Sequence, residues 1–153
     1  MKLIIAEDDP NKLKSLVEFV RGIHPEWTII EKRSYRSGLK AIIEESPNLV
    51  ILDMSMPTFD VSLSEKGGRT RAYAGREILA ELRRRKLLAK VVIVTQFESF
   101  GEGAATMTLT QLREQLAAKF ATNYIDTVYY QASESNWKKS LAALLDRISL
   151  ASK

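Results

Sequence analysis

Five short apolar runs alternate along the chain with stretches in which apolar residues recur every three or four positions. Apolar runs rich in β-branched residues predict strands buried on both faces, and the longer period predicts amphipathic helices. Regular alternation of strands and helices predicts an α/β protein, (βα)₅, whose parallel five-stranded sheet is doubly wound, with helices on both faces. The strands are expected at 2–6, 27–31, 49–52, 91–95 and 124–132. The helices are expected from Pro10 to about Gly22, around Leu39–Ile43, from about Gly75 to Lys86, around Leu109–Phe120, and after Ser133 or Ser135.

Two of the expected helices begin with capping signals. Asp9 precedes Pro10, which suits an N-cap followed by proline in the first helical position. Thr108 and Gln111 have the spacing of a capping box. The two signals predict that one helix starts at Pro10 and another at Leu109.

Carboxylates follow two of the predicted strands at the point where each strand ends. Glu7 and Asp8 follow the first strand, and Asp53 follows the third. In an open parallel sheet the carboxyl ends of the strands form the ligand crevice, so these three side chains are expected to meet there. Three neighbouring carboxylates repel one another unless a cation neutralises them, and oxygen ligands suit Mg²⁺. The sequence therefore predicts a magnesium site.

The ordered set of motifs resembles the receiver domain of two-component response regulators over nearly the whole chain. The segments that carry the resemblance are 4–10, 49–57, 74–79 and 91–95. The resemblance implies a flavodoxin-like or CheY-like fold with strand order 2-1-3-4-5. It also implies one receiver-like domain, residues 1–153, acting in two-component phosphorelay signal transduction.

The resemblance also implies roles for individual residues. Asp53 would accept a phosphoryl group, and Thr95 would hydrogen-bond that group. Glu7, Asp8, Asp53 and the backbone carbonyl of Ser55 would hold Mg²⁺. The expected activity is at most self-phosphorylation and self-dephosphorylation at Asp53, so the chain is not expected to be an enzyme in the usual sense.

The sequence departs from the family pattern at two positions. The family has a lysine at the end of the fifth strand, usually followed by proline, whereas Tyr130 or Gln131 stands there in this chain. Gln96 follows the fourth strand, where the family prefers a small residue. Tyr130 or Gln131 could substitute for the missing lysine by donating a hydrogen bond, although neither supplies a charge. Arg69 and Arg71, in the connection after Asp53, are further candidate substitutes because arginine binds phosphoryl oxygens well.

Two connections are longer than this fold normally has, at about 58–73 and about 96–107. Receivers usually signal and pair through the face made by helix 4, strand 5 and helix 5, next to the second connection. We therefore expect a downstream protein partner, or a homodimer, on that face. The resemblance implies a histidine kinase or another phosphoryl donor as the upstream partner.

The composition excludes some kinds of site and disfavours some classes of partner. The 153 residues include 23 basic and 19 acidic side chains and no cysteine, which excludes disulfides and thiolate metal sites. No apolar run reaches membrane length, so a cytoplasmic protein without a membrane partner is expected. The basic run 83–86 complements a helix C-terminus, so nucleic acid is not an expected partner. No output domain follows within the chain, so signalling is expected to use non-covalent contacts.

Two functional hypotheses remain open from the sequence. The first is a single-domain receiver that is phosphorylated on Asp53 with Mg²⁺ and signals by protein contact. The alternative is a pseudo-receiver that acts as a constitutive interaction module, motivated by the missing lysine, Gln96 and the two long connections. A phosphatase of the haloacid dehalogenase type is disfavoured, because Ser55 stands where that family has its second aspartate.

Overall fold

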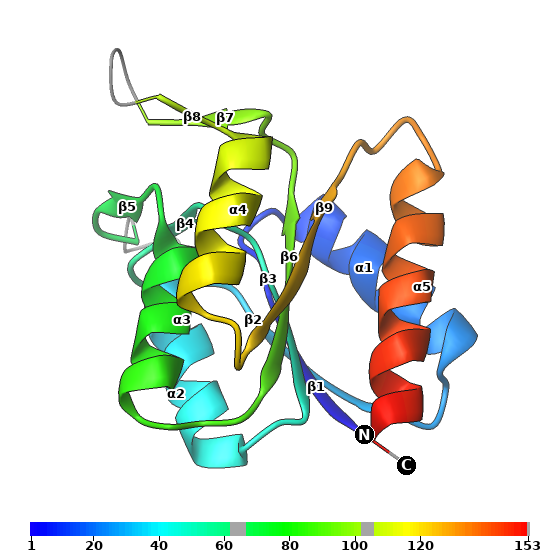
Figure 1. Ribbon diagram of the computed structural model, residues 1–153. Helices are drawn as coiled ribbons and strands as arrows, with labels where there is room; N and C mark the ends of the chain where they lie inside the picture. Colours follow the sequence, from blue (N-terminus) through cyan, green and yellow to red (C-terminus); the bar gives the residue numbers. More distant parts are fainter. Residues whose placement is uncertain (62–66, 102–105, 153) are drawn as a thin grey trace.

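The computed structural model describes residues 1–61, 67–101 and 106–152, and a five-stranded parallel sheet is at its centre (Figure 1). Its strand order is β2-β1-β3-β6-β9, which confirms the predicted order of the five main strands. These strands are β1 (Lys2–Ala6), β2 (Thr28–Lys32), β3 (Leu49–Leu52), β6 (Lys90–Thr95) and β9 (Tyr124–Tyr129). The helices are α1 (Pro10–Ile23), α2 (Tyr35–Glu45), α3 (Ala74–Arg84), α4 (Leu109–Lys119) and α5 (Asn136–Ala151).

Helices cover both faces of the sheet. Figure 1 shows α1 and α5 on one side and α2, α3 and α4 on the other. Successive residues of a strand point to opposite faces, so Ile4 packs in the core under α2 and α3 while Leu3 and Ile5 pack in the core under α1 and α5. The two cores explain why the central strands are apolar without alternation.

The predicted helix starts are confirmed, but two predicted ends are wrong. The Asp9 side chain accepts hydrogen bonds from the N–H groups of Asn11 and Lys12, and the Thr108–Gln111 capping box is present. The third helix ends at Arg84, because Lys86 adopts a left-handed conformation with φ of 57°. The last strand ends at Tyr129, because its neighbour β6 ends opposite it at Thr95.

Each long connection contains a short antiparallel ladder. In the first, β4 (Met56–Pro57) pairs with β5 (Thr70–Arg71). In the second, β7 (Ser99–Phe100) pairs with β8 (Met107–Thr108). Residues 62–66 and 102–105, which complete these predicted loops, lie outside the described residues. The two ladders follow β3 and β6, so both extend from the carboxyl edge of the sheet (Figure 1).

Two features of the helices concern nucleic acid and the membrane, which were considered above as partners. In the basic run at the end of α3, Arg84 and Arg85 both bind the carboxylate of Glu81, at 2.6 and 3.1 Å. Across the described ranges, none of the helices combines the length and the apolar character needed to cross a bilayer.

Gly75 allows α3 to approach the end of β3 closely. Its N–H donates to the carbonyl of Met54 at 3.0 Å. A Cβ on Gly75 would lie 2.9 Å from the Asp53 carbonyl oxygen and 3.1 Å from Cδ1 of Ile93. Because Gly75 has no side chain, the start of α3 can pack directly on the backbone that carries Asp53.

We expect Gly75→Ala to lower the free energy of unfolding by about 1–3 kcal/mol, since overpacking against backbone cannot be relieved by a rotamer change. Gly22→Ala is the matched control, because a Cβ there meets nothing within 4 Å and alanine favours the helix. Urea denaturation of the two variants measures the difference. Equal stability of Gly75→Ala and the parent would contradict the close approach.

Candidate functional site

The predicted acidic side chains lie together at the carboxyl edge of the sheet. Strands β1 and β3 are neighbours, with Ala6 paired to Leu52, so the residues that follow them are brought side by side. One carboxylate oxygen from each of Glu7, Asp8 and Asp53 lies within 4.8 Å of the others. Glu7 and Asp53 are buried, and Asp8 reaches solvent. A ligand can therefore approach this cluster from the side of Asp8.

Backbone hydrogen bonds hold the two buried carboxylates. Oδ1 of Asp53 accepts from the N–H of Met54 at 2.6 Å, and the Asp53 N–H donates to the Ala6 carbonyl at 3.1 Å. Oε1 of Glu7 accepts from the N–H of Asp9 at 3.0 Å. The second oxygen of each carboxylate is left for another partner.

That partner is Lys12, from the first turn of α1. Its Nζ lies 2.6 Å from Oε2 of Glu7 and 3.2 Å from Oδ2 of Asp53. The same ammonium donates to the carbonyl of Val94 at 2.7 Å, and only 1% of the Lys12 side chain is exposed. The site thus contains a buried cation between two buried carboxylates.

Sequence reasoning missed Lys12, although the pattern contained a signal. Leu16 and Val20 follow Lys12 at intervals of four residues, so Lys12 occupies the apolar face of α1. A lysine in that position cannot reach water easily and needs a buried counter-charge. The predicted cluster of Glu7, Asp8 and Asp53 could supply that negative charge, so the sequence contained enough information to place Lys12 at the site.

When all of its carboxylates are ionised, the cluster carries more negative charge than one ammonium neutralises. Burial raises the pKa of Glu7 to about 8, the negative charge of Asp53 adds to this rise, and Lys12 opposes it. Burial also raises the pKa of Asp53, again against the effect of Lys12. A divalent cation would remove the excess, and the all-oxygen donor set at the partly open edge fits Mg²⁺.

The residues at the expected lysine position do not contribute a charge. Tyr130 is buried; its ring packs on Trp137 with centroids 4.9 Å apart and lies 5.6 Å from Nζ of Lys12. Gln131 is exposed. An aromatic ring therefore lies directly after β9, and the ammonium comes from α1 instead.

Arg69 and Arg71 belong to the β4–β5 connection. The guanidinium of Arg71 lies 4.4 Å from the ring centre of Tyr35 and also contacts Thr58 and Glu77. Arg69 is exposed, and its carbonyl accepts from the N–H of Thr58 at 2.9 Å. Within the ranges that the structure describes, the side chain that forms an ion pair with Asp53 is Lys12.

Three further predicted positions lie at the ends of β3 and β6. Thr95 ends β6 fully buried, and its hydroxyl oxygen accepts from the N–H of Phe97 at 3.2 Å. Gln96 is exposed. Ser55, whose carbonyl was expected to bind Mg²⁺, lies two residues after Asp53 and is partly exposed.

Comparisons with known proteins identify the family. No family model matches the sequence. The uncharacterized protein y4jR of Sinorhizobium fredii is 32% identical over 143 residues, which are 92% of this chain and 94% of that protein. The Detocs response regulatory protein DtcB of Enterobacter cloacae is 25% identical over 92% of this chain and 95% of its own length. A LuxR-family DNA-binding response regulator from Staphylococcus aureus superposes with a TM-score of 0.62 at 24% identity, covering 96% of this chain and 97% of that one.

The chain belongs to the response-regulator receiver family. The expected resemblance and the CheY-like α/β fold are therefore both confirmed. A further receiver structure, response regulator protein TrrA of Thermotoga maritima, was solved in complex with Mg²⁺ and beryllofluoride. It superposes with a TM-score of 0.57 at 20% identity over 94% of this receiver and 97% of its own chain.

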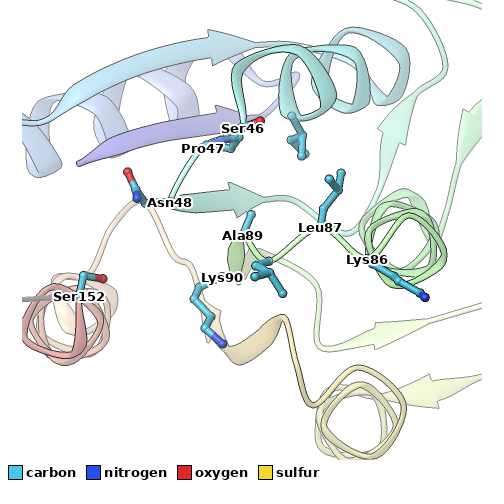
Figure 2. A pocket seen from close by; sticks show the side chains of 10 residues that line it. Ser46, Pro47, Asn48, Lys86, Leu87, Ala89, Lys90 and Ser152 are labelled. Atoms are coloured by element: carbon cyan, nitrogen blue, oxygen red, sulfur yellow. The ribbon is translucent and has the colours of Figure 1, made fainter.

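A hollow at the opposite edge of the receiver lies apart from this site. Figure 2 shows its lining, in which Asn48 precedes β3 and Lys90 begins β6. The hollow therefore lies at the amino ends of the strands, whereas Asp53 follows the carboxyl end of β3. The crevice expected for this fold is at the Asp53 edge.

The raised pKa of Glu7 predicts a pH-dependent stability in the metal-free receiver. Between about pH 5 and pH 8 the folded state retains a proton that the unfolded chain, with its ordinary pKa of 4.5, has released. The free energy of unfolding should therefore fall as the pH rises through this range. Denaturation in a chelator should show a shallower fall for Glu7→Gln. Identical pH dependence in the two proteins would contradict the assignment.

Proposed function

We propose that this receiver accepts a phosphoryl group on Asp53 with the help of Mg²⁺ and signals through protein contacts. The observation that carries the proposal is the buried Asp53 carboxylate with Glu7 and Asp8 within 4.8 Å of it. Family membership supports it, as does the name of one relative as a response regulatory protein. The relatives with named roles are regulators, and no classical enzymatic activity is proposed for this chain.

The proposed reaction is a phosphoryl transfer to a carboxylate. An Asp53 oxygen forms a bond to phosphorus, while the bond from phosphorus to the donor's leaving group breaks and the leaving group retains the electron pair. Glu7, Asp8, Asp53 and the carbonyl of Ser55 would hold Mg²⁺, which when bound supplies positive charge between the two anions. The Met54 N–H keeps the Asp53 carboxylate in one orientation.

Thr95 would link the new charge to a surface change. Its hydroxyl can donate to a phosphoryl oxygen, and it now accepts from the N–H of Phe97. Phe97 lies in the connection that leads into β7 and β8. Reorientation of Thr95 toward the phosphoryl group would therefore act on the connection that precedes α4.

The proposed output surface is the face formed by α4, β9 and α5, which run side by side in Figure 1. Arg113 on α4 binds Asp126 on β9 with N–O distances of 2.8 to 3.1 Å, so the two elements are tied at their surface. The face would bind a downstream protein or a second copy of the chain. The proposed donor is a histidine kinase or another phosphoryl donor, and the proposed location is the cytoplasm.

A constitutive pseudo-receiver is the competing function. Its main motivation was the absence of a cation at the end of the last main strand, where Tyr130 stands. Lys12 supplies a cation at the same carboxylate from another element, which weakens that motivation. Gln96, the second motivation, is exposed to solvent and is not buried in the site.

Incubation with Mg²⁺ and acetyl phosphate should add one phosphoryl group to the parent protein, as measured by intact mass. Asp53→Asn should gain none, because the amide cannot form the acyl phosphate. Asp146→Asn is the matched control: Asp146 is exposed on α5 and should leave labelling unchanged. If the parent gains no mass although Mg²⁺ binds, the pseudo-receiver is the better account.

A further inference from the structure

We infer that Lys12 is the cationic side chain that binds the phosphoryl group in this receiver, from a position on α1 rather than at the end of the last main strand. The inference rests on the proposed phosphorylation of Asp53 and assigns a further catalytic residue to that reaction. Three observations carry it: the position of Nζ, the burial of the side chain, and the identity of the residue at the end of β9.

The first observation is the position of the ammonium. Nζ of Lys12 lies 3.2 Å from Oδ2 of Asp53, the carboxylate that would carry the phosphoryl group. A lysine has three N–H donors on a flexible stem, so it can exchange one acceptor for another with little movement. An anionic group built on Asp53 would be within reach of this ammonium.

The second observation is that local structure gives no reason for a lysine at this position. Lys12 lies in the first turn of α1, where the positive end of the helix dipole disfavours a cation. It occupies the apolar face of the helix, and its side chain is 1% exposed. The neighbouring Lys14, by contrast, is exposed and pairs with Glu18 on the surface. The requirement for Lys12 therefore comes from the site.

The third observation concerns the end of β9. Tyr130 follows β9 directly; its N–H donates to the Thr95 carbonyl at 2.7 Å, and its ring centre lies 5.6 Å from Nζ of Lys12. The ring of Tyr130 and the ammonium of Lys12 are therefore neighbours at the carboxyl edge of the sheet. The residue that follows β9 is thus uncharged, and the cation beside Asp53 comes from α1.

The contacts of Lys12 also suggest what changes on phosphorylation. Its ammonium now contacts Glu7, Asp53 and the carbonyl of Val94, which precedes Thr95. A phosphoryl group on Asp53 would compete with these acceptors for the same N–H donors. Both Thr95 and the carbonyl before it would then respond to the one event at Asp53.

Lys12→Met tests the inference, with Lys14→Met as the matched exposed control. At saturating Mg²⁺, labelling of Lys12→Met by acetyl phosphate should slow by about 10²-fold, the usual loss on removing one charge-stabilising donor. Its affinity for beryllofluoride should fall at least about tenfold, while Mg²⁺ binding measured by calorimetry persists because the carboxylates that would hold the ion remain. Lys14→Met should match the parent in all three.

A double variant separates catalysis from stability. Lys12→Met combined with Tyr130→Lys restores a cation from the strand end and should recover labelling well above Lys12→Met alone. Labelling of Lys12→Met at the parent's rate, with only its melting temperature lowered, would overturn the inference and leave Lys12 a structural counter-charge. No labelling of the parent itself would instead overturn the proposed phosphorylation, and this inference with it.

A measurement on the unaltered chain covers the case in which Lys12→Met does not fold. The assigned Cε–Hε signal of Lys12 in the NMR spectrum should shift when beryllofluoride is added in the presence of Mg²⁺. The Lys14 signal should stay in place. An unmoved Lys12 signal in a protein that binds beryllofluoride would show that the ammonium does not contact the phosphoryl analogue.

Discussion

The site depends on the balance of charge among Glu7, Asp53 and Lys12. Two carboxylates and one ammonium are buried together, with the nitrogen 2.6 and 3.2 Å from the two oxygens. Removing one partner from a buried ion pair typically costs about 3–5 kcal/mol, because the remaining charge is left uncompensated. The arrangement is nonetheless incomplete, since a single ammonium faces two carboxylates and Asp8 lies beside them. The remaining negative charge is what would attract a divalent cation and then a phosphoryl donor.

The fold brings these groups together from separate parts of the chain. Parallel pairing of β1 with β3 brings Glu7 beside Asp53, and the Asp9 cap starts α1 so that Lys12 lies over the same edge. Gly75 lets α3 pack directly on the Asp53 backbone. Apolar cores on both sides of the sheet hold the strands in place. The geometry of the site therefore follows from backbone pairing and helix packing rather than from flexible side chains.

Much of this could be predicted from the sequence. Apolar runs and helical periods predicted the sheet, and the strand ends placed Glu7 and Asp53 at one edge. Lys12 was missed because the helical period was read only through apolar residues such as Leu16 and Val20, so a lysine on the same face went unnoticed. The predicted substitute cations, Arg69 and Arg71, lie near Asp53 in the sequence. In the structure, Arg71 is held by Tyr35 and Glu77, whereas the ion pair of Asp53 comes from a helix 41 residues earlier.

The ends of helices and strands were harder to predict, because they depend on contacts with parts of the chain that are distant in the sequence. The stop of β9 at Tyr129 depends on where its neighbour β6 ends, which no local pattern reveals. The ladders β4–β5 and β7–β8 are only two residues long on each strand, too short for a periodic signal. Tertiary pairing, rather than propensity, determines both features.

The most direct measurement is an experimental structure of the protein with Mg²⁺ and beryllofluoride. The account predicts beryllofluoride on Asp53, Mg²⁺ held at the acidic cluster, and Nζ of Lys12 within hydrogen-bond distance of a fluoride. Beryllofluoride bound on Asp53 with the ammonium still on Glu7 and Val94, or with another cation against the fluorides, would contradict it.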